Sequence, residues 1–216
     1  MPSPQPIASA LHYPSIGMAA IAIGGLPVAW NIVARNEYRN KSIQNSPLFL
    51  KFKKNNRQAA AYLLAVGIFV ASCGRDALFK VAMDRNPSSV LPLLCPHMFG
   101  RHREAVFAAI KCIAYALFTF GSTLVLTSFA RLGVTGTYLG DYCGILMKER
   151  VTAFPFSHFE NPMYLGATLN FFAAALAENN AVGVLLTGWV GLVYHVTTTY
   201  CENPFTSKIY EDKDKH

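Results

Sequence analysis

Long stretches without a single charged residue divide this chain. Residues 1–34 contain no Asp, Glu, Lys or Arg, and four more such runs follow: Gln58–Gly74, Cys112–Ala130, Asn161–Ala177 and Asn179–Cys201. A spanning helix needs about 20 mostly apolar residues, and side chains that snorkel at helix ends allow slightly shorter runs to cross. The pattern predicts an all-α, polytopic transmembrane helical bundle with about four spanning helices.

The first apolar stretch, Ile16–Ala34, allows two interpretations. Gly24, Gly25 and Pro27 lie at its centre, and Trp30 is a residue type typical of the membrane interface. The stretch can cross the bilayer with a kink or re-enter one leaflet. No basic segment precedes it, so it lacks the pattern of a secretory signal peptide. We therefore expect an amino-terminal spanning or re-entrant helix beside the other four.

Polar residues mark the expected ends of the helices. The second run extends by about one turn if Arg75 and Asp76 lie at the membrane interface. The polar turn at residues 178–180 separates the last two runs, so Asn161–Cys201 is expected to form a helical hairpin. Pro204 follows the second helix of this hairpin and is expected to end it.

Composition and charge indicate a membrane protein and an orientation. Only 14% of the residues are charged, against about 25% in soluble domains. In so apolar a chain, the net charge of +7 favours loops beside anionic lipid headgroups over a nucleic-acid partner. Segment 35–57 carries seven basic residues and one acidic, and segment 75–111 carries six and three. The positive-inside rule then predicts that 35–57, 131–160 and the carboxy-terminal tail are cytosolic.

Several familiar chemistries have no signature here. The five cysteines contain no C-x-x-C pair and the six histidines have no metal-ligand spacing, so no metal site is expected. There is also no Walker sequence, G-x-S-x-G or H-E-x-x-H. No segment resembles a linker and no internal repeat is found. We expect a single integral-membrane domain over residues 1–216.

Small residues form two of the clusters that stand out from the apolar runs. Gly121, within Thr119-Phe120-Gly121, either lets two helices pack closely or leaves room for a ligand against the backbone. Gly136, Gly140 and Gly144 are four residues apart, which predicts a glycine stripe on one helical face or, alternatively, the wall of a pocket.

Polar residues form the other two clusters. Asn161-Pro162 suits the start of a helix, but helix initiation does not explain why Tyr164 and Gly166 follow. Glu202 lies where the last helix meets the cytosol, either as a solvated helix end or as part of a site. Polar groups at membrane depth are costly, so they are packed inward or functional. The residues themselves therefore indicate a polytopic protein with a polar pocket at its cytosolic face.

Four strings in these regions resemble the phospholipid N-methyltransferase family. They are GTYLGDYCGIL (136–146), RVTAFPF (150–156), ENPMYLG (160–166) and ENPFTSKIY (202–210), and PVAWNIVARNEYRNK (27–41) is similar to the family's first membrane segment. The resemblance implies an S-adenosylmethionine-dependent enzyme of the endoplasmic reticulum membrane, with a mitochondrial membrane as the alternative. It would methylate a phospholipid substrate within the bilayer.

The substrate implied by this resemblance is an ethanolamine headgroup on its way to phosphatidylcholine. Family members either start from the monomethyl lipid or perform all three methylations, and this sequence is more similar to the first, compact type. Two alternatives stay open at this stage: an isoprenylcysteine-type carboxyl methyltransferase and a non-catalytic membrane scaffold. The oligomeric state is left open as well.

The resemblance also implies cofactor-binding residues. The family's adenosylmethionine-binding G-x-G falls on Thr119-Phe120-Gly121, where threonine replaces the first glycine. Its paired acids fall on Glu202-Asn203, where an amide replaces the second carboxylate. Asn203 still offers a hydrogen-bond acceptor for a ribose or an amino group.

Methyl transfer to an amine requires that the nitrogen first lose its proton, so a nearby acceptor is expected. The catalytic candidates are Glu202, Asp141 and Glu160. Tyr142 and Tyr164 are the substrate-binding candidates because aromatic rings attract the cationic centres through cation–π contacts. Asn161 is the third substrate-binding candidate, beside Tyr164 in the same motif.

Overall fold

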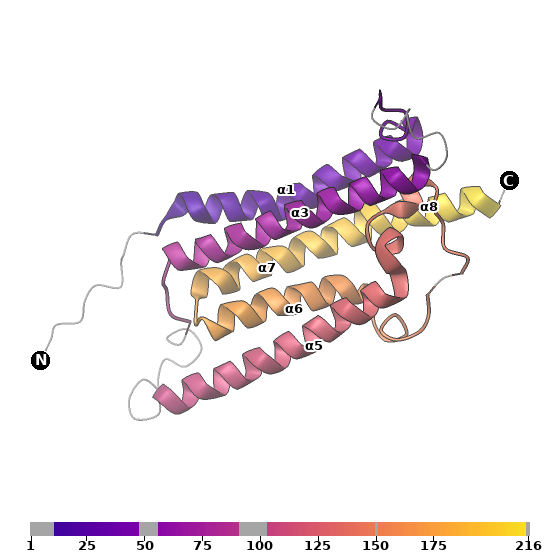
Figure 1. The fold of residues 1–216 in the computed structure, drawn as a ribbon. Helices are drawn as coiled ribbons and strands as arrows, with labels where there is room; N and C mark the ends of the chain where they lie inside the picture. Colours follow the sequence, from indigo (N-terminus) through magenta and orange to yellow (C-terminus); the bar gives the residue numbers. More distant parts are fainter. Residues whose placement is uncertain (1–10, 48–55, 91–102, 150, 215–216) are drawn as a thin grey trace, which may run out of the picture.

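The computed structural model describes residues 11–47, 56–90, 103–149 and 151–214 (Figure 1). Over these ranges the chain folds into long, roughly parallel or antiparallel helices, and no β-strand is present in them. The all-α prediction is confirmed. The helices are α1 (Tyr13–Asn40), α3 (Asn56–Arg85), α5 (Arg103–Thr137), α6 (Pro162–Ala177), α7 (Ala181–Val196) and α8 (Asn203–Asp214).

Two shorter elements connect these helices. A 3₁₀ turn, η1 (Gly140–Cys143), follows α5, and a π-helical turn, η2 (Thr197–Glu202), joins α7 to α8. In the described part of the chain, four helical segments are long and apolar enough to cross a membrane: Tyr13–Asn40, Arg57–Arg85, Glu104–Cys143 and Ala181–Asp212. The apolar helix Pro162–Ala177 is shorter, at about 24 Å. The protein is therefore a multi-pass membrane protein.

The amino-terminal stretch forms one continuous helix of 28 residues through Pro27. Its length and composition are sufficient for crossing a membrane, which favours the spanning interpretation over the re-entrant one. Gly24 faces the indole of Trp189 on α7, and a Cβ at Gly24 would lie 3.2 Å from that ring. The indole Nε1 of Trp189 also donates a 3.0 Å hydrogen bond to the carbonyl of Ala20. These contacts hold α1 against α7.

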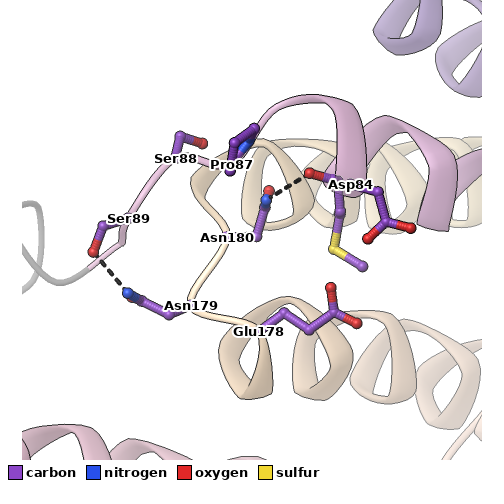
Figure 2. A pocket seen from close by; sticks show the side chains of 8 residues that line it. Asp84, Pro87, Ser88, Ser89, Glu178, Asn179 and Asn180 are labelled. Carbon is purple, nitrogen blue, oxygen red and sulfur yellow. Dashed lines mark hydrogen bonds between the residues drawn. The ribbon is translucent and has the colours of Figure 1, made fainter. Parts of the chain in front are cut away.

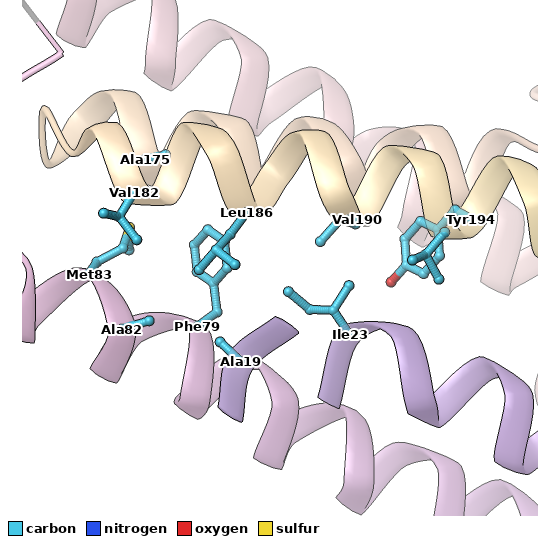
Figure 3. Packing of buried hydrophobic residues seen from close by; sticks show 11 residues of the cluster. Ala19, Ile23, Phe79, Ala82, Met83, Ala175, Val182, Leu186, Val190 and Tyr194 are labelled. Carbon is cyan, nitrogen blue, oxygen red and sulfur yellow. The ribbon is translucent and has the colours of Figure 1, made fainter. Parts of the chain in front are cut away.

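The main hydrophobic core lies where α1, α3, α6 and α7 meet (Figure 3). Ile23 from α1, Phe79 and Met83 from α3, and Leu186 and Val190 from α7 are buried there. Other large apolar side chains point outward on the same helices and on α5, among them Ile21, Phe69, Leu126 and Leu185. Extensive exposed apolar surface is expected of helices that face lipid.

Helices α5 and α6 approach most closely at two glycines. A Cβ at Gly121 would lie 2.6 Å from the carbonyl oxygen of Gly166, and a Cβ at Gly166 would lie 2.5 Å from the carbonyl oxygen of Gly121. No larger residue fits either position without moving a backbone. The space beside Gly121 is thus filled by α6, which is the packing interpretation of this glycine.

One end of the bundle, which we call the α8 end, gathers segments that are far apart in sequence. α1 ends there, α3 and α6 begin there, and α8 packs against η1 (Figure 1). Thr206 Oγ1 donates to Asp141 Oδ2 at 3.4 Å, and the backbone N–H of Met147 donates to Tyr210 Oη at 3.2 Å. The described parts of segment 131–160 and of the tail therefore meet at the same end, as the predicted topology requires.

Two local predictions were wrong, each for a backbone reason. The glycine stripe does not exist because α5 ends at Thr137, before Gly140, and Gly144 ends η1 with φ 81°. Pro204 does not end the last helix, because it occupies the first turn of α8, where its missing N–H breaks no hydrogen bond. The second apolar run does extend beyond Arg75: α3 continues to Arg85, and the Arg75 side chain is largely buried.

Candidate active site

Glu202 is the focus of a cluster built from three helices. The hydroxyl of Tyr164 on α6 donates a 2.6 Å hydrogen bond to Glu202 Oε2. The amide of Asn31 on α1 donates to Glu202 Oε1 at 3.4 Å. Glu202 is the last residue of the π-helical turn η2, and such turns occur frequently at functional sites. Two donors from separate elements therefore fix the orientation of one carboxylate.

A chain of contacts through the bundle holds Tyr164 in place. Its ring lies against that of Tyr194, with centroids 4.8 Å apart. Tyr194 Oη in turn accepts a 2.6 Å hydrogen bond from Arg75 Nη1. The Arg75 guanidinium also lies over the ring of Phe171, 5.2 Å from its centroid. An arginine at membrane depth is expensive unless it is partnered, and here its partners set the position of Tyr164.

A second acidic group lies on η1, beside the start of α8. Asp141 accepts a hydrogen bond from Thr206, as described above, and one from the backbone N–H of Tyr142 at 3.1 Å. The Tyr142 ring is 1% exposed and stacks on Phe205, with centroids 5.1 Å apart and an angle of 19°. The Arg35 guanidinium lies 4.8 Å from the centroid of Phe205. This end of the bundle thus combines two carboxylates, a cation and stacked rings.

Polar atoms without partners are concentrated in the same region. Five buried side-chain atoms in the described ranges have no hydrogen-bond partner: Trp30 Nε1, Asn31 Oδ1, Arg35 Nε, Thr137 Oγ1 and Tyr142 Oη. Trp30 and Tyr142 belong to one hydrophobic cluster with Phe205 and Leu139. Buried polar groups are nearly always hydrogen-bonded in native proteins. Their concentration here is the pattern expected of a ligand site.

Two cavities lie at different places in the bundle. A cavity of about 160 Å³ lies between α1 and η2, and Asn31 and Arg35 are part of its wall. A larger one of about 370 Å³ lies at the opposite end, beside the α6–α7 turn. Figure 2 shows the larger one, where Asn179 donates to Ser89 and Asn180 donates to the Met83 carbonyl. No sequence-predicted site residue lines the larger cavity.

Comparison with known proteins identifies the family. Residues 110–213 match the family described as phospholipid methyltransferase. The chain is 43% identical to a phosphatidyl-N-methylethanolamine N-methyltransferase of Neurospora crassa over 201 residues. These aligned residues make up 93% of this chain and 85% of that protein. A protein of the same name from Schizosaccharomyces pombe is 40% identical over 197 residues, 91% of this chain and 90% of the relative.

This chain belongs to the phospholipid methyltransferase family. A phosphatidylethanolamine N-methyltransferase of Mus musculus is also similar, at 37% identity over 200 residues, 93% of this chain and 90% of that protein. No solved structure matches the chain. The region matched by the family runs from α5 to α8 and contains Asp141, Tyr164 and Glu202. The chain is thus a membrane-embedded enzyme that uses a methyl donor.

Some residues predicted for this methyltransferase come together and others do not. Tyr164 and Glu202 are joined directly by a hydrogen bond. Asn203 is half-buried at the start of α8. Asn161 occupies the position before α6, but its side chain caps no backbone N–H. Glu160 is exposed. Of the predicted carboxylates, Glu160 is thus the one that lies apart from this site.

The predicted G-x-G region lies on the far side of α6 from Glu202. Gly121 contacts Gly166, whereas Glu202 contacts Tyr164. Residues two positions apart on a helix point to different faces, so α6 separates Gly121 from the carboxylate. Thr119 and Phe120 are exposed, and the Thr119 hydroxyl bonds to a backbone carbonyl of its own helix. The structure does not bring these three residues to Glu202.

Sequence reasoning missed the contribution of α1 to the site. Asn31 and Arg35 were recognised only as part of a family string, yet Asn31 bonds to Glu202 and Arg35 Nη2 donates to the carbonyl of Cys201 at 2.8 Å. Their i, i+4 spacing was the available signal, because it places both polar side chains on one face of an apolar helix. Phe205 and Thr206, which contact the η1 residues, lie within the last family string and were missed as well.

Proposed function

We propose that this protein converts phosphatidyl-N-methylethanolamine through the dimethyl lipid to phosphatidylcholine, with S-adenosylmethionine as the methyl donor. The relatives from Neurospora crassa and Schizosaccharomyces pombe are named for N-methylation of the monomethyl lipid. The observation that carries the proposal is the Glu202 carboxylate, which Tyr164 and Asn31 orient from two other helices. The names of the relatives and the geometry at Glu202 favour an N-methyltransferase. They favour it over an isoprenylcysteine-type carboxyl methyltransferase and over a non-catalytic membrane scaffold.

The residues at the α8 end fit a donor of this class. Adenosylmethionine supplies a methyl group bound to a positively charged sulfur. Glu202 and Asp141 offer negative charge to its cationic groups, and Asn203 offers hydrogen bonds to its polar ones. Aromatic rings such as those of Tyr142 and Tyr164 are favourable neighbours for a cation. We assign no part of this donor site to Thr119, Phe120 or Gly121, since α6 lies between Gly121 and Glu202.

Glu202 is proposed to accept the proton that the amine must lose before it attacks the methyl group. The N–H proton moves to a carboxylate oxygen, and the freed lone pair on nitrogen would form the new bond to the methyl carbon. The carbon–sulfur bond of the donor would break at the same time, and its electron pair would stay on the sulfur, which leaves as a neutral thioether. Tyr164 and Asn31 hold the carboxylate in one orientation, so no rearrangement is needed for this step. Asp141 is the alternative acceptor. The exposed position of Glu160 gives it no support in this role.

Burial of the site supports the reaction as well. Tyr142 is almost fully buried, and apolar residues of α1 and α3 pack around it. Exclusion of water strengthens the contacts of charged groups and prevents hydrolysis of the donor. We further propose that the enzyme resides in the endoplasmic reticulum membrane with the α8 end in the cytosol. The excess of basic residues in segment 35–57 supports this orientation.

A lipid-product assay tests the proposed function. Purified protein in nanodiscs would receive methyl-labelled adenosylmethionine and one acceptor lipid at a time: phosphatidylethanolamine, its monomethyl form or its dimethyl form. We expect label in phosphatidylcholine from the monomethyl and dimethyl lipids. Label in none of the three lipids would contradict the proposal.

The same assay tests a second function, in which the protein also performs the first methylation. The relative from Mus musculus, named a phosphatidylethanolamine N-methyltransferase, is the observation that favours it. Rapid labelling of phosphatidylethanolamine would assign all three steps to this chain. Labelling of the two methylated lipids alone would restrict it to the last two.

A further inference from the structure

The cavity between α1 and η2 lies beside exposed apolar side chains of α1, which suit contact with lipid. It has a volume of about 160 Å³ and is walled by α1 on one side and by Thr197 and Cys201 of η2 on the other. Val28 and Ile32 form its outer rim, and both are largely exposed apolar residues. We call this cavity the α1–η2 groove. Its rim suits acyl chains, and its wall is mostly apolar, with polar groups from Asn31, Arg35 and Thr197.

Asn31 gives the groove a buried acceptor without a partner. The side chain is 6% exposed, and its Nδ2 donates to the Pro27 carbonyl at 3.0 Å and to Glu202. Its Oδ1 is buried and accepts no hydrogen bond. An unsatisfied buried acceptor is unfavourable unless a ligand supplies the donor. A ligand with an N–H or O–H group close to the Glu202 carboxylate would satisfy the Oδ1 atom.

Arg35 gives the groove a cation one helical turn closer to the α8 end. Its Nη2 donates to the Cys201 carbonyl at 2.8 Å, which fixes the guanidinium across the groove. Its Nε is buried and has no partner. No carboxylate forms an ion pair with Arg35 in the described ranges. A guanidinium with free donors is well suited to bind a phosphate.

The spacing of these two side chains matches a phospholipid headgroup. Residues at i and i+4 on a helix are about 5–6 Å apart between Cβ atoms. Four covalent bonds join the nitrogen of an ethanolamine to the phosphorus of its phosphate, which is a similar reach. We propose that the α1–η2 groove binds the phosphoethanolamine headgroup of the lipid substrate, with the phosphate on Arg35 and the amine between Asn31 Oδ1 and Glu202. This assignment rests on the proposed function.

The arrangement also distinguishes substrate from product. The protonated monomethyl and dimethyl amines each carry at least one N–H, which Asn31 Oδ1 accepts. The trimethylated nitrogen of phosphatidylcholine carries none, so the product loses this hydrogen bond and leaves the acceptor unsatisfied. A site that bonds an N–H discriminates against a ligand without one. The groove therefore binds substrate more tightly than product and favours product release.

Variants of the two side chains test this groove. Arg35→Gln removes the positive charge, and Arg35→Lys keeps the charge but lacks the paired N–H donors of the guanidinium. Arg39→Gln is the matched control at an exposed position of the same helix. We expect the KM for phosphatidyl-N-methylethanolamine in mixed micelles to rise at least about tenfold in Arg35→Gln. Arg35→Lys should restore part of the loss, and Arg39→Gln should match the wild type. Equilibrium binding of adenosylmethionine should be unchanged in all three.

Asn31→Leu tests the amine contact separately. We expect this variant to lose the preference for monomethyl lipid over phosphatidylcholine, measured by competition for a photoactivatable monomethyl lipid in vesicles. The competition assay measures lipid binding and does not require catalysis. If the wild-type protein binds the monomethyl lipid but does not methylate it, the proposed function is contradicted and the groove is not. An unchanged KM in Arg35→Gln, or an unchanged lipid preference in a folded Asn31→Leu, would overturn the groove.

Discussion

The Tyr164 hydroxyl and the Glu202 carboxylate are 38 residues apart in the chain and 2.6 Å apart in the structure. The first lies at the start of α6, and the second ends the π-helical turn after α7. Because α6 and α7 form an antiparallel hairpin, residues at its two open ends are brought together. The hairpin thereby places a hydroxyl donor on the carboxylate that we assign as proton acceptor.

Tyr164→Phe removes this donor and keeps the ring. A hydrogen bond to a charged group contributes about 1.5–3 kcal/mol, so we expect kcat to fall by about tenfold or more while the protein remains folded. Tyr200→Phe is the matched control, since Tyr200 lies on the same π-helical turn but is 71% exposed. Rates of methyl transfer measured side by side check this prediction, and equal rates for the two variants would contradict it.

Gly166→Ala tests the contact between α5 and α6. The added methyl group would lie 2.5 Å from the carbonyl oxygen of Gly121, so the two helices must move apart. Overpacking of this kind costs about 1–3 kcal/mol, and we expect a lower thermal unfolding temperature in detergent. Gly188→Ala is the control because nothing lies within 4 Å of its Cβ. A Gly166→Ala protein as stable as Gly188→Ala would show that the helices are less closely packed than described.

Glu37 stabilises the turn after α1, away from the proposed chemistry. Its buried carboxylate accepts hydrogen bonds from the backbone N–H of Ile43 and from the side-chain amide of Gln44, at 2.5 and 2.8 Å. Glu37→Gln would turn an NH₂ group toward these donors. We expect a loss of about 1–3 kcal/mol in the free energy of unfolding, and no such loss for the exposed Glu149→Gln. Denaturant or thermal melts that show equal stability would refute this role.

The bundle could be predicted because its determinants lie within each helix. Charge-free runs anticipated the helices, and the polar turn at 178–180 anticipated the α6–α7 hairpin. The prediction that Pro204 ends the last helix was wrong because a proline that breaks a helix and one in a helix's first turn look alike in sequence. Only the π-helical turn before it decides between them, and that turn packs against α1.

The site could be predicted only in part, because its partners come from separate helices. Glu202 and Tyr164 stood out as polar residues that helix ends do not explain. The bond between them follows from the α6–α7 hairpin, whereas the approach of Asn31 depends on how α1 packs against η2, which no local pattern encodes. Gly121 could not be assigned from sequence, since a glycine that serves a ligand and one that serves a neighbouring helix have the same local sequence.

The most direct measurement compares methyl transfer by Glu202→Gln and Glu211→Gln in nanodiscs that contain phosphatidyl-N-methylethanolamine. General acid–base groups contribute about 10²–10⁴-fold to rate. We expect Glu202→Gln to fall by at least about 100-fold, and Glu211→Gln, exposed on α8, to retain the wild-type rate. A folded Glu202→Gln protein that methylates the lipid at the wild-type rate would contradict the assignment of this carboxylate as the proton acceptor.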